Sequence, residues 1–511
     1  MSASREKKQR QAMAGLSEKE KQAAIDAKKA HRNHILYAVI GIIVVVAVAA
    51  LLIWDNGIIQ RNLTAYSVNG HNYTIADVEY FYYSEYNSYY STYGTYLFDD
   101  DESLKDQVAY TDDDDNEVTW HDLLLEDSLS TLEAMTILYD EAEAAGYTIS
   151  EDGEAEVQET LETLETYAET YEVTTSYYIQ YLYGSYMTES RLEKLLTMYT
   201  IASEYSELKS DEFTDAVTED EIAEYYEENA DSLDTYNYHV YYLDGSAEDT
   251  TDDDGNTVEA TDEEEEAAME AALEVAEELQ AALEDGDDDA VEELVDDDDS
   301  IISDYGDYED TLGSSVSSNY SDFLFDTDTE EGDVEVVEVT TGYYVVQFYS
   351  RELDEYHPAT YRDIHITAEV DDDADEPTED QLAEAYETAE ALLDEIESED
   401  DFIDLVADNS DDTSTNDSEG LNESDTRSSV PDDNIGAWLF DEERSEGDTA
   451  IVEDEDGTGY YILYFVSYDE LSYWEQTATS ALASDAYDAW YEEVSADVSA
   501  STGLGYSLVG G

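Results

Sequence analysis

The chain contains no cysteine and few basic residues. Without a thiol among its 511 residues, it can form no disulfide, no thiolate metal site, no cysteine nucleophile and no lipid-modified cysteine. Only 18 residues are Lys or Arg against 136 Asp or Glu, which gives a formal net charge of −118. Self-repulsion at this charge destabilises a compact state at low salt and disfavours binding to nucleic acid. The composition therefore predicts a salty or cation-rich milieu, with nonspecific divalent cations at the acidic runs.

Motifs of several common enzyme classes are also missing. The sequence has no His-Glu-x-x-His, no Gly-x-Ser-x-Gly and no phosphate-binding loop. The acids near Gly255, Gly332 and Gly457 do not have the spacing of an EF-hand. We therefore expect no cofactor and no dedicated metal site.

Half of the basic residues lie before one long apolar segment. Residues 35–54 form a run of about twenty apolar residues, the length of a bilayer-spanning helix. Nine of the 18 Lys and Arg residues lie in residues 1–34, so the positive-inside rule makes this a cytoplasmic basic tail. A cleaved signal peptide is the alternative, but the long tail and the bulky residues 51–54 favour a retained anchor. The prediction is a single-pass cell-membrane protein with its C-terminal bulk extracellular.

Residues 55–230 are predicted to form a helical domain. Apolar and tyrosine side chains recur there every three or four positions. Helix starts, each a threonine with an acid three residues later, lie at Thr74, Thr119 and Thr218. Residues 471–511 supply a further amphipathic helix and a tail, and we expect residues 471–498 to pack back on the helical domain.

Two later stretches of the chain close with the same pattern. The first reads Leu324-Phe325-Asp326, Glu331-Gly332-Asp333 and Gly342-Tyr343-Tyr344. The second reads Leu439-Phe440-Asp441, Glu446-Gly447-Asp448 and Gly459-Tyr460-Tyr461. Each is preceded by an acidic helical segment and, before that, by a strand with one histidine. This order predicts two copies of a small α/β domain, at residues 236–352 and 359–470.

The order of these segments resembles the SurA/PrsA type of extracytoplasmic foldase, which carries parvulin-like (PpiC-type) peptidyl-prolyl isomerase domains. Residues 183–192 and 217–229 are similar to segments of its chaperone domain, and Gly420 stands where parvulins have a Gly-rich loop. The resemblance covers residues from about 65 to 498. It implies an α+β multidomain protein with an N-terminal transmembrane helix, a SurA-N-like helical chaperone domain and two parvulin-like α/β domains, the first of them degenerate.

The resemblance also implies catalytic positions. His365 in the second domain and His239 in the first match the family's first active-site histidine, and Asp412 matches its Cys/Asp position. Tyr461 and Tyr344 stand where the two domains should have the second histidine. We expect the copies to superpose with His239 over His365. Because a tyrosine hydroxyl cannot take the tautomer role of histidine, we expect reduced activity in the second domain and little or none in the first.

Prolyl isomerisation needs a pocket rather than a nucleophile. Rotation about a peptide bond has a barrier of about 18–20 kcal/mol, which a catalyst lowers by holding the proline and favouring the twisted amide. The resemblance places Ile435 where a proline-pocket phenylalanine is expected, and Trp438 follows it in the closing pattern. Ile435 and Trp438 are therefore the expected substrate-binding residues.

The predicted function is a membrane-anchored extracytoplasmic foldase and chaperone for secreted proteins, with peptidyl-prolyl cis-trans isomerisation in the second domain. Its expected partners are unfolded or partly folded secreted polypeptides, and no nucleic acid. The alternative is a noncatalytic acidic cell-surface scaffold or binding protein that reuses the fold. An open cleft at His365 favours the foldase, and a filled site favours the scaffold.

Overall fold

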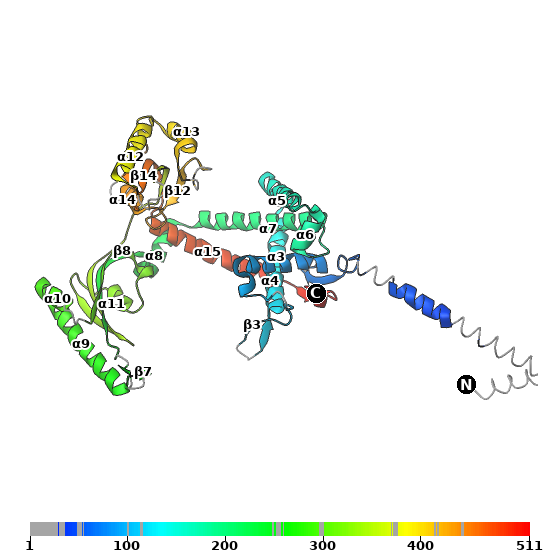
Figure 1. The fold of residues 1–511 in the computed structure, drawn as a ribbon, viewed down its shortest axis with the longest axis horizontal. Helices are drawn as coiled ribbons and strands as arrows, with labels where there is room; N and C mark the ends of the chain where they lie inside the picture. The colour runs from blue at the N-terminus through cyan, green and yellow to red at the C-terminus, as the bar shows by residue number, and fades with distance from the viewer. Residues whose placement is uncertain are drawn as a thin grey trace, which may run out of the picture. The chain divides into compact units, whose positions relative to one another are not determined.

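The computed structural model describes most of the chain. The described residues are 29, 36–48, 54, 56–99, 102–112, 116–247, 250–251, 257–258, 260–295, 301–368, 370, 377–412, 415, 418–440 and 444–510. The chain divides into two compact units, Met1–Phe213 with Ala486–Gly511, and Thr214–Asp485 (Figure 1).

The predicted membrane span is described only in part. Residues 36–48 are helical and their side chains are exposed. Residues 35 and 49–53 lie outside the described residues, as does the basic tail apart from residue 29. Over the part of the chain that the structure describes, no helix is both long enough and apolar enough to cross a bilayer.

The first unit is mainly helical. Its helices are α3 (Ile75–Tyr93), α4 (Trp120–Ala145), α5 (Glu151–Thr170), α6 (Thr175–Tyr183) and most of α7 (Glu189–Ala216). Its strands are β1 (Thr64–Val68), β2 (His71–Thr74) and β15 (Ala500–Thr502) in one sheet, and β3 (Val108–Thr111) and β4 (Glu117–Thr119) in a hairpin. Thr74 and Thr119 cap α3 and α4 as the sequence predicts.

The C-terminal end of the chain completes this unit. Helix α15 (Tyr473–Ser495) places Trp490 against Tyr205, with ring centroids 6.3 Å apart. The hydroxyls of Tyr487 and Ser206 lie 2.6 Å apart, and β15 pairs with β1. The expectation that the last helix packs on the helical domain is confirmed for its C-terminal part.

The second unit begins with helix α8 (Glu219–Leu233), capped by Thr218 as predicted, and continues with two α/β modules. The first module contains β5 (Thr235–Asp244), α9 (Asp262–Asp285), α10 (Asp288–Val295), β8 (Ile302–Leu312), α11 (Ser321–Phe325), β9 (Val334–Val339) and β10 (Gly342–Glu352). The short strands β6 (Thr250–Thr251) and β7 (Thr257–Val258) lie between β5 and α9. Its four-stranded antiparallel sheet has the order β8-β5-β10-β9.

The second module repeats this arrangement. It contains β11 (Ala359–Thr367), α12 (Glu379–Leu393), α13 (Glu399–Asn409), β12 (Leu421–Asp425), α14 (Asp433–Phe440), β13 (Thr449–Glu453) and β14 (Gly459–Tyr468). The sheet order β12-β11-β14-β13 matches that of the first module, strand for strand. The repeated closing motif therefore corresponds to a repeated sheet.

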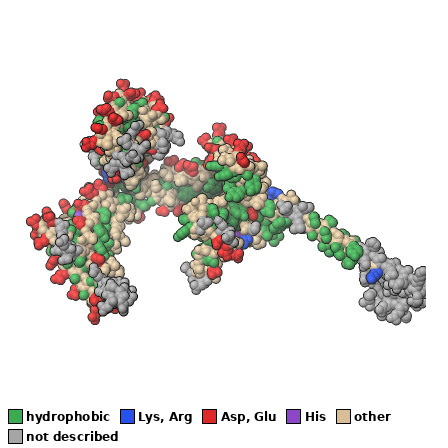
Figure 2. Space-filling model, viewed as in Figure 1, with side chains coloured by type: hydrophobic (Ala, Val, Ile, Leu, Met, Phe, Trp, Pro, Cys, Tyr) green, Lys and Arg blue, Asp and Glu red, His purple; other side chains and the backbone are tan. Residues whose placement is uncertain are grey.

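The sheet of the second module has a different cover on each face. Helices α12 and α13 pack on one face, where Ile364 and Ile462 are fully buried. Helix α14 packs on the other face, where Tyr361 and Leu463 are fully buried. Because side chains alternate along a strand, His365 lies on the face of Tyr361. Acidic side chains occupy much of the visible surface of the second unit (Figure 2).

Candidate functional site

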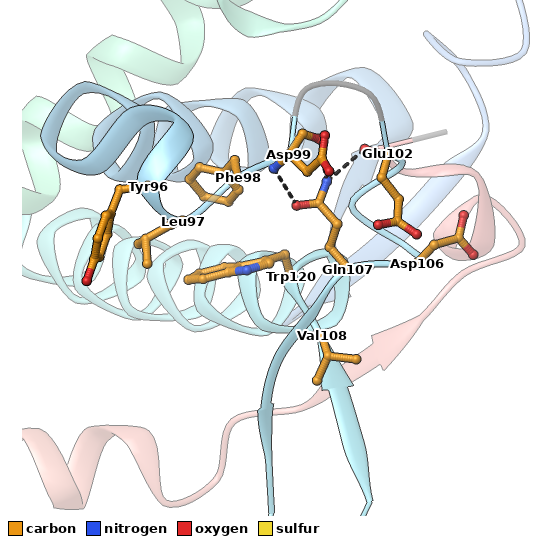
Figure 3. Close-up of a pocket in the computed structure, with 9 residues that line it drawn as sticks. All are labelled: Tyr96, Leu97, Phe98, Asp99, Glu102, Asp106, Gln107, Val108 and Trp120. Atoms are coloured by element: carbon orange, nitrogen blue, oxygen red, sulfur yellow. Dashed lines mark hydrogen bonds between the residues drawn. The ribbon is translucent and has the colours of Figure 1, made fainter.

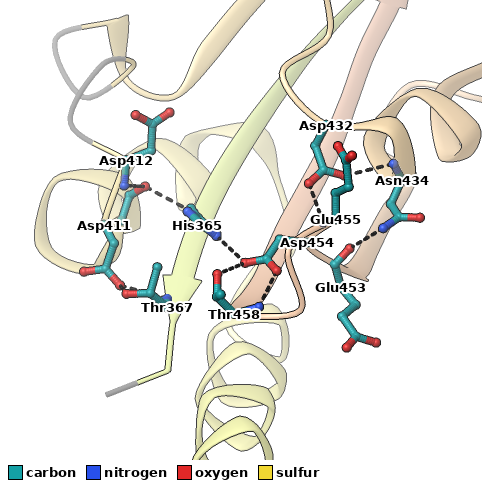
Figure 4. A network of polar contacts seen from close by, with 11 residues as sticks. His365, Thr367, Asp411, Asp412, Asp432, Asn434, Glu453, Asp454, Glu455 and Thr458 are labelled. Atoms are coloured by element: carbon teal, nitrogen blue, oxygen red, sulfur yellow. Dashed lines mark hydrogen bonds and ion pairs between the residues drawn. The ribbon is translucent and has the colours of Figure 1, made fainter. Parts of the chain in front are cut away.

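The strand register of the second module brings two predicted site residues together. His365 on β11 lies directly opposite Tyr461 on β14. Their rings stack, with centroids 4.1 Å apart and planes 14° apart. The Nε2 atom of His365 lies 3.1 Å from Oδ2 of Asp454 (Figure 4). The ring is therefore held both by stacking and by a carboxylate.

Asp454 is itself tightly held, although no sequence pattern singles it out. Its side chain is 5% exposed, and it accepts hydrogen bonds from the Thr458 N–H at 2.6 Å and the Thr458 hydroxyl at 2.9 Å. Burial alone would raise the pKa of Asp454, but the hydrogen bonds from Thr458 and His365 hold it below its ordinary value. An ionised carboxylate only accepts hydrogen bonds, so Nε2 of His365 carries the proton. Asp454 lies in the turn between β13 and β14, and no sequence motif includes it.

The loop after α13 is tied to β11 beside His365. The Asp411 N–H donates to the His365 carbonyl at 2.8 Å, and the Asp411 carboxylate accepts from the N–H and hydroxyl of Thr367 at 2.9 and 2.7 Å. The Ser410 hydroxyl accepts from the N–H groups of His365 and Asp412, at 3.2 and 3.3 Å. These contacts position Asp412 next to His365, on the side away from Asp454 (Figure 4).

A buried carboxylate, Asp363, lies two residues before His365 on the same face. It is 2% exposed and accepts a hydrogen bond from Asn422 Nδ2 at 2.7 Å. Burial raises the pKa of Asp363 to about 6, the Asn422 hydrogen bond opposes that rise, and the charge of Asp412 adds to it. The backbone of Asp363 also donates to the Gly420 carbonyl at 3.0 Å, so the predicted glycine position adjoins this strand.

Gly420 occupies a left-handed backbone conformation that favours glycine. Its φ is +72°, and a Cβ there would lie 2.6 Å from the Asp363 carbonyl oxygen. Both the left-handed conformation and the close approach explain why this position carries no side chain.

The Tyr461 hydroxyl stays protonated at neutral pH. Burial raises the pKa of Tyr461 to about 12, with further contributions from four nearby carboxylates. These belong to Asp432, Asp363, Asp454 and Asp412. The hydroxyl can therefore both donate and accept a hydrogen bond in this anionic surrounding.

The two expected substrate-binding residues, Ile435 and Trp438, are both at least partly covered. Ile435 on α14 is fully buried and packs with Leu439 and Leu463, since it lies on the apolar side of a short amphipathic helix. It therefore offers no surface to a bound proline. Trp438 is partly buried, and the Arg444 guanidinium lies 4.9 Å above its ring.

The first module does not place its histidine where the second module does. Tyr344 lies opposite Tyr242, as Tyr461 lies opposite His365. His239 instead lies opposite Gln347 and belongs to the other face of the sheet. The expectation that His239 superposes on His365 is therefore wrong, because Tyr242 occupies that position. An offset by an odd number of residues moves a side chain to the opposite face.

His239 is engaged on that opposite face. Its Nδ1 lies 2.7 Å from Asp307 and its Nε2 lies 2.8 Å from Asp304, both on β8. Its ring also lies 4.3 Å from that of Tyr241. The sequence did contain a signal for the correct alignment, because Tyr238 precedes Tyr242 by the same interval as Tyr361 precedes His365.

Tyrosines occupy the face of the first module that corresponds to the His365 site. Tyr242 and Tyr344 have ring centroids 5.1 Å apart, and Tyr320 lies 5.5 Å from Tyr344. Tyr238 and Tyr308 stack at 4.8 Å. This face of β5 and β10 has hydroxyl groups where the second module has an imidazole.

The helical unit has an open hollow of about 600 Å³ (Figure 3). It is lined by Tyr96, Leu97, Phe98, Asp99, Glu102, Asp106, Gln107, Val108 and Trp120. The rings of Phe98 and Trp120 lie 4.8 Å apart. The buried Gln107 amide donates to the carbonyls of Asp99 and Glu102 at 2.9 and 2.7 Å, which orders the acidic rim. An aromatic wall thus adjoins a row of carboxylates.

Metal binding has no candidate site in the described part of the chain. Within it, no group of three or more His, Asp or Glu side chains could hold a metal ion.

Residues 365–466 match the family model Rotamase, described as the PPIC-type PPIase domain. Over this range the second module is similar to parvulin-type (PPIC) domains. The matched segment begins at His365 and includes Asp412, Gly420 and Tyr461, so it contains the site described above. The predicted resemblance to the parvulin-like domains of SurA/PrsA-type foldases is confirmed for this segment.

Solved structures show weaker similarity to the chain. The foldase PrsA from Streptococcus pneumoniae is 10% identical, with a TM-score of 0.24 over 75% of this chain and 90% of that one. PrsA from Bacillus cereus is 14% identical, with a TM-score of 0.20 over 48% and 77%. A SurA-like chaperone structure from Campylobacter jejuni is 10% identical, with a TM-score of 0.15 over 57% and 82%. These TM-scores are too low to add to the parvulin match. No curated protein matches the chain.

Proposed function

We propose that this protein is a membrane-anchored extracytoplasmic foldase that holds unfolded secreted polypeptides and isomerises prolyl bonds through its second α/β module. The observation that carries the proposal is the parvulin match over residues 365–466, which contains the stacked His365 and Tyr461. A domain of this type supports an isomerase of prolyl peptide bonds rather than a hydrolase or a transferase.

The side chains of the site act by hydrogen bonding alone. Asp454 engages the Nε2–H of His365, so that the imidazole is fixed in one orientation and one tautomer. The Tyr461 hydroxyl stacked beside it is the group free to donate to an amide as the prolyl bond twists out of conjugation. One such hydrogen bond contributes about 1–2 kcal/mol, or roughly tenfold in rate. We therefore expect modest isomerase activity.

The activity is tested by measuring cis-trans exchange of a prolyl peptide with the full chain, at high salt. His365→Ala removes the stacking partner of Tyr461, and we expect it to lower the exchange rate several-fold. The control is Glu387→Gln, since Glu387 is exposed on α12 away from the site. Exchange in the wild type that His365→Ala leaves unchanged would place the site elsewhere.

Client holding is supported by the hollow in the helical unit. Tyr96 and Val108 line it and are 88% and 47% exposed, so they offer apolar surface to an unfolded chain. We expect Tyr96→Ser combined with Val108→Ser to weaken suppression of aggregation of an unfolded model protein. Tyr181→Ser, which removes another exposed tyrosine outside the hollow, is the matched control. Equal loss in both variants would mean that the hollow has no special role.

Membrane anchoring is supported by the sequence of residues 1–54, in which a basic tail precedes an apolar run. In this topology the N-terminus is cytoplasmic and the remaining chain is extracellular. Protease added to intact cells should then digest the bulk of the chain and spare the tail. A mature N-terminus located after residue 54 would contradict the anchor.

A noncatalytic binding role is the second candidate, and one observation favours it for the first module. Tyr242 stands in the place of the histidine there, and His239 faces the opposite side of the sheet. In this role the module binds a polypeptide without isomerising it. A wild-type protein that binds prolyl peptides but does not accelerate their exchange would extend the scaffold function to the whole chain.

A further inference from the structure

The floor of the His365–Tyr461 site is formed by the carboxylates of Asp363, Asp412, Asp432 and Asp454. Two of them, Asp432 and Asp454, lie on the β13–β14 side. Asp454 contacts the imidazole at 3.1 Å. Asp432 is 5% exposed and accepts the N–H groups of Glu455 and Asn434, each at 2.8 Å. Because the Glu455 amide is next in the chain after Asp454, these bonds place the two carboxylates on the same side of the imidazole (Figure 4).

Further carboxylates complete the floor. Asp412 lies on the other side of the imidazole, held by its N–H contact to Ser410. Asp363 lies on the same sheet face, where it is buried and accepts a hydrogen bond from Asn422. All of these groups act on the Tyr461 hydroxyl, which is itself uncharged. A ligand that reaches Tyr461 therefore enters a surrounding of four carboxylates.

Apart from His365 itself, no lysine or arginine in the described part of the module contacts this group of carboxylates. Residues 359–468 contain three basic residues. Arg362 points to the opposite sheet face, where it binds α13. Arg427 pairs with Asp354, and Arg444 lies over the Trp438 ring at 4.9 Å. The arginines of the module therefore leave this charge available to a cationic ligand.

We propose that this site selects prolyl segments in which a lysine or arginine immediately precedes the proline. The inference rests on the proposed isomerase function and specifies its substrate class. The residue before proline carries the carbonyl of the rotating amide, so its side chain leaves the backbone beside the catalytic groups. A cation there is attracted by the floor, and a glutamate is repelled by it. Several carboxylates at a partly buried site give a preference on the order of tenfold.

The test compares three peptides that differ only in the residue before proline, which is Lys, Leu or Glu. Exchange rates and binding affinities are both measured with the full chain by NMR, at about 0.1 M and about 1 M salt. We expect the lysyl peptide to bind and exchange at least about tenfold better than the glutamyl peptide, with the leucyl peptide between them. At high salt the difference should shrink, because screening shortens the range of the floor's charge.

Substitutions locate the preference. Asp432→Asn keeps the shape of the side chain and removes one charge, so it should reduce the lysyl-to-glutamyl ratio. Asp412→Asn does the same from the other side of His365, and it serves as the second variant if loss of the Asp432 backbone contacts unfolds the module. Glu387→Gln removes one charge from α12 on the opposite sheet face, and it should leave the ratio unchanged.

The exchange rates and the binding affinities test the isomerase function and the selectivity separately. Equal exchange and equal binding of the three peptides would overturn the selectivity and leave the isomerase function standing. If no peptide is exchanged, the isomerase function falls, and the binding series alone decides the selectivity. In that case tighter binding of the lysyl peptide supports the charged floor, and equal or absent binding overturns it.

Discussion

Tyr461 and His365 form a pair whose two members have different hydrogen-bonding capacity. The hydroxyl of Tyr461 has one proton to donate and remains uncharged, because burial and the nearby carboxylates raise its pKa to about 12. The imidazole of His365 has its Nε2 proton directed to Asp454. A pair of histidines could share a proton between the rings, and the present pair cannot. We therefore expect the His365–Tyr461 pair to accelerate isomerisation less than a pair of histidines would.

Tyr461→His should raise the exchange rate of a prolyl peptide by about tenfold, because it restores a second imidazole opposite the first. NMR exchange with the full chain measures the effect. Tyr460→His is the control, since Tyr460 lies on the α12 face of the same strand, 5.2 Å from Tyr386. A similar gain from Tyr460→His would mean that the added imidazole acts nonspecifically.

Asp363 gives a pH dependence of stability with a defined sign. Its pKa is raised from 3.8 to about 6 in the folded state, mainly by burial. The folded state therefore binds this proton more tightly than the unfolded state does. The resulting stabilisation is complete below pH 4 and is lost as the pH rises through 6.

Asp363→Asn should abolish the loss of folding stability at higher pH. A neutral amide of the same shape carries no charge to bury and can still accept the Asn422 hydrogen bond. The variant should exceed the wild type in stability by a few kcal/mol above pH 6, and the difference should vanish near pH 4. Urea unfolding, followed by the signals of the second module at both pH values, measures this difference. A variant that is less stable than the wild type at pH 7.5 would show that the charge of Asp363 is needed in place.

At the level of elements, features set by neighbouring residues could be predicted from the sequence, whereas contacts between residues far apart in the chain could not. The helix caps at Thr74, Thr119 and Thr218 were predictable because each depends on residues three positions apart. The repeated sheet was predictable from its repeated closing motif. The place of His239 was predicted wrongly, because the shared histidine is a misleading guide and the matching Tyr238–Tyr242 and Tyr361–His365 spacing marks the true alignment. Asp454 was not predictable, since its contact with His365 joins residues far apart in the chain.

The turn at Gly420 is an element whose backbone conformation can be tested. Gly420 and Gly457 both have positive φ, of +72° and +66°, but only Gly420 closely approaches another backbone. Gly457→Ala should cost about 1 kcal/mol for the left-handed conformation alone. Gly420→Ala should cost at least about 1–3 kcal/mol, since a Cβ would also meet the Asp363 carbonyl oxygen. Thermal unfolding of both variants compares the two costs, and equal losses would mean that the turn relaxes freely.

At the scale of the whole molecule, the fold has to withstand a strong excess of negative charge. The chain carries 136 acidic residues, and the cation–carboxylate pairs of the described residues involve few of them. The carboxylates of helices α9 and α12 are exposed. Each contributes little alone, but their mutual repulsion favours expansion of the chain and opposes folding.

Salt should therefore stabilise this protein more than it stabilises a protein of balanced charge. The Debye length falls from about 10 Å at 0.1 M to about 3 Å at 1 M ionic strength, so repulsion between neighbouring carboxylates is largely screened at the higher value. We expect the unfolding midpoints of both units to rise by several degrees between these conditions with potassium chloride, which screens charge without strongly strengthening apolar burial. Sucrose at equal osmolality is the control for exclusion from the surface, because it leaves the charge unscreened. A midpoint that rises equally in sucrose and in salt would show that repulsion is not what limits stability. A midpoint that does not move in salt would show that the acidic surface is already neutralised by bound cations.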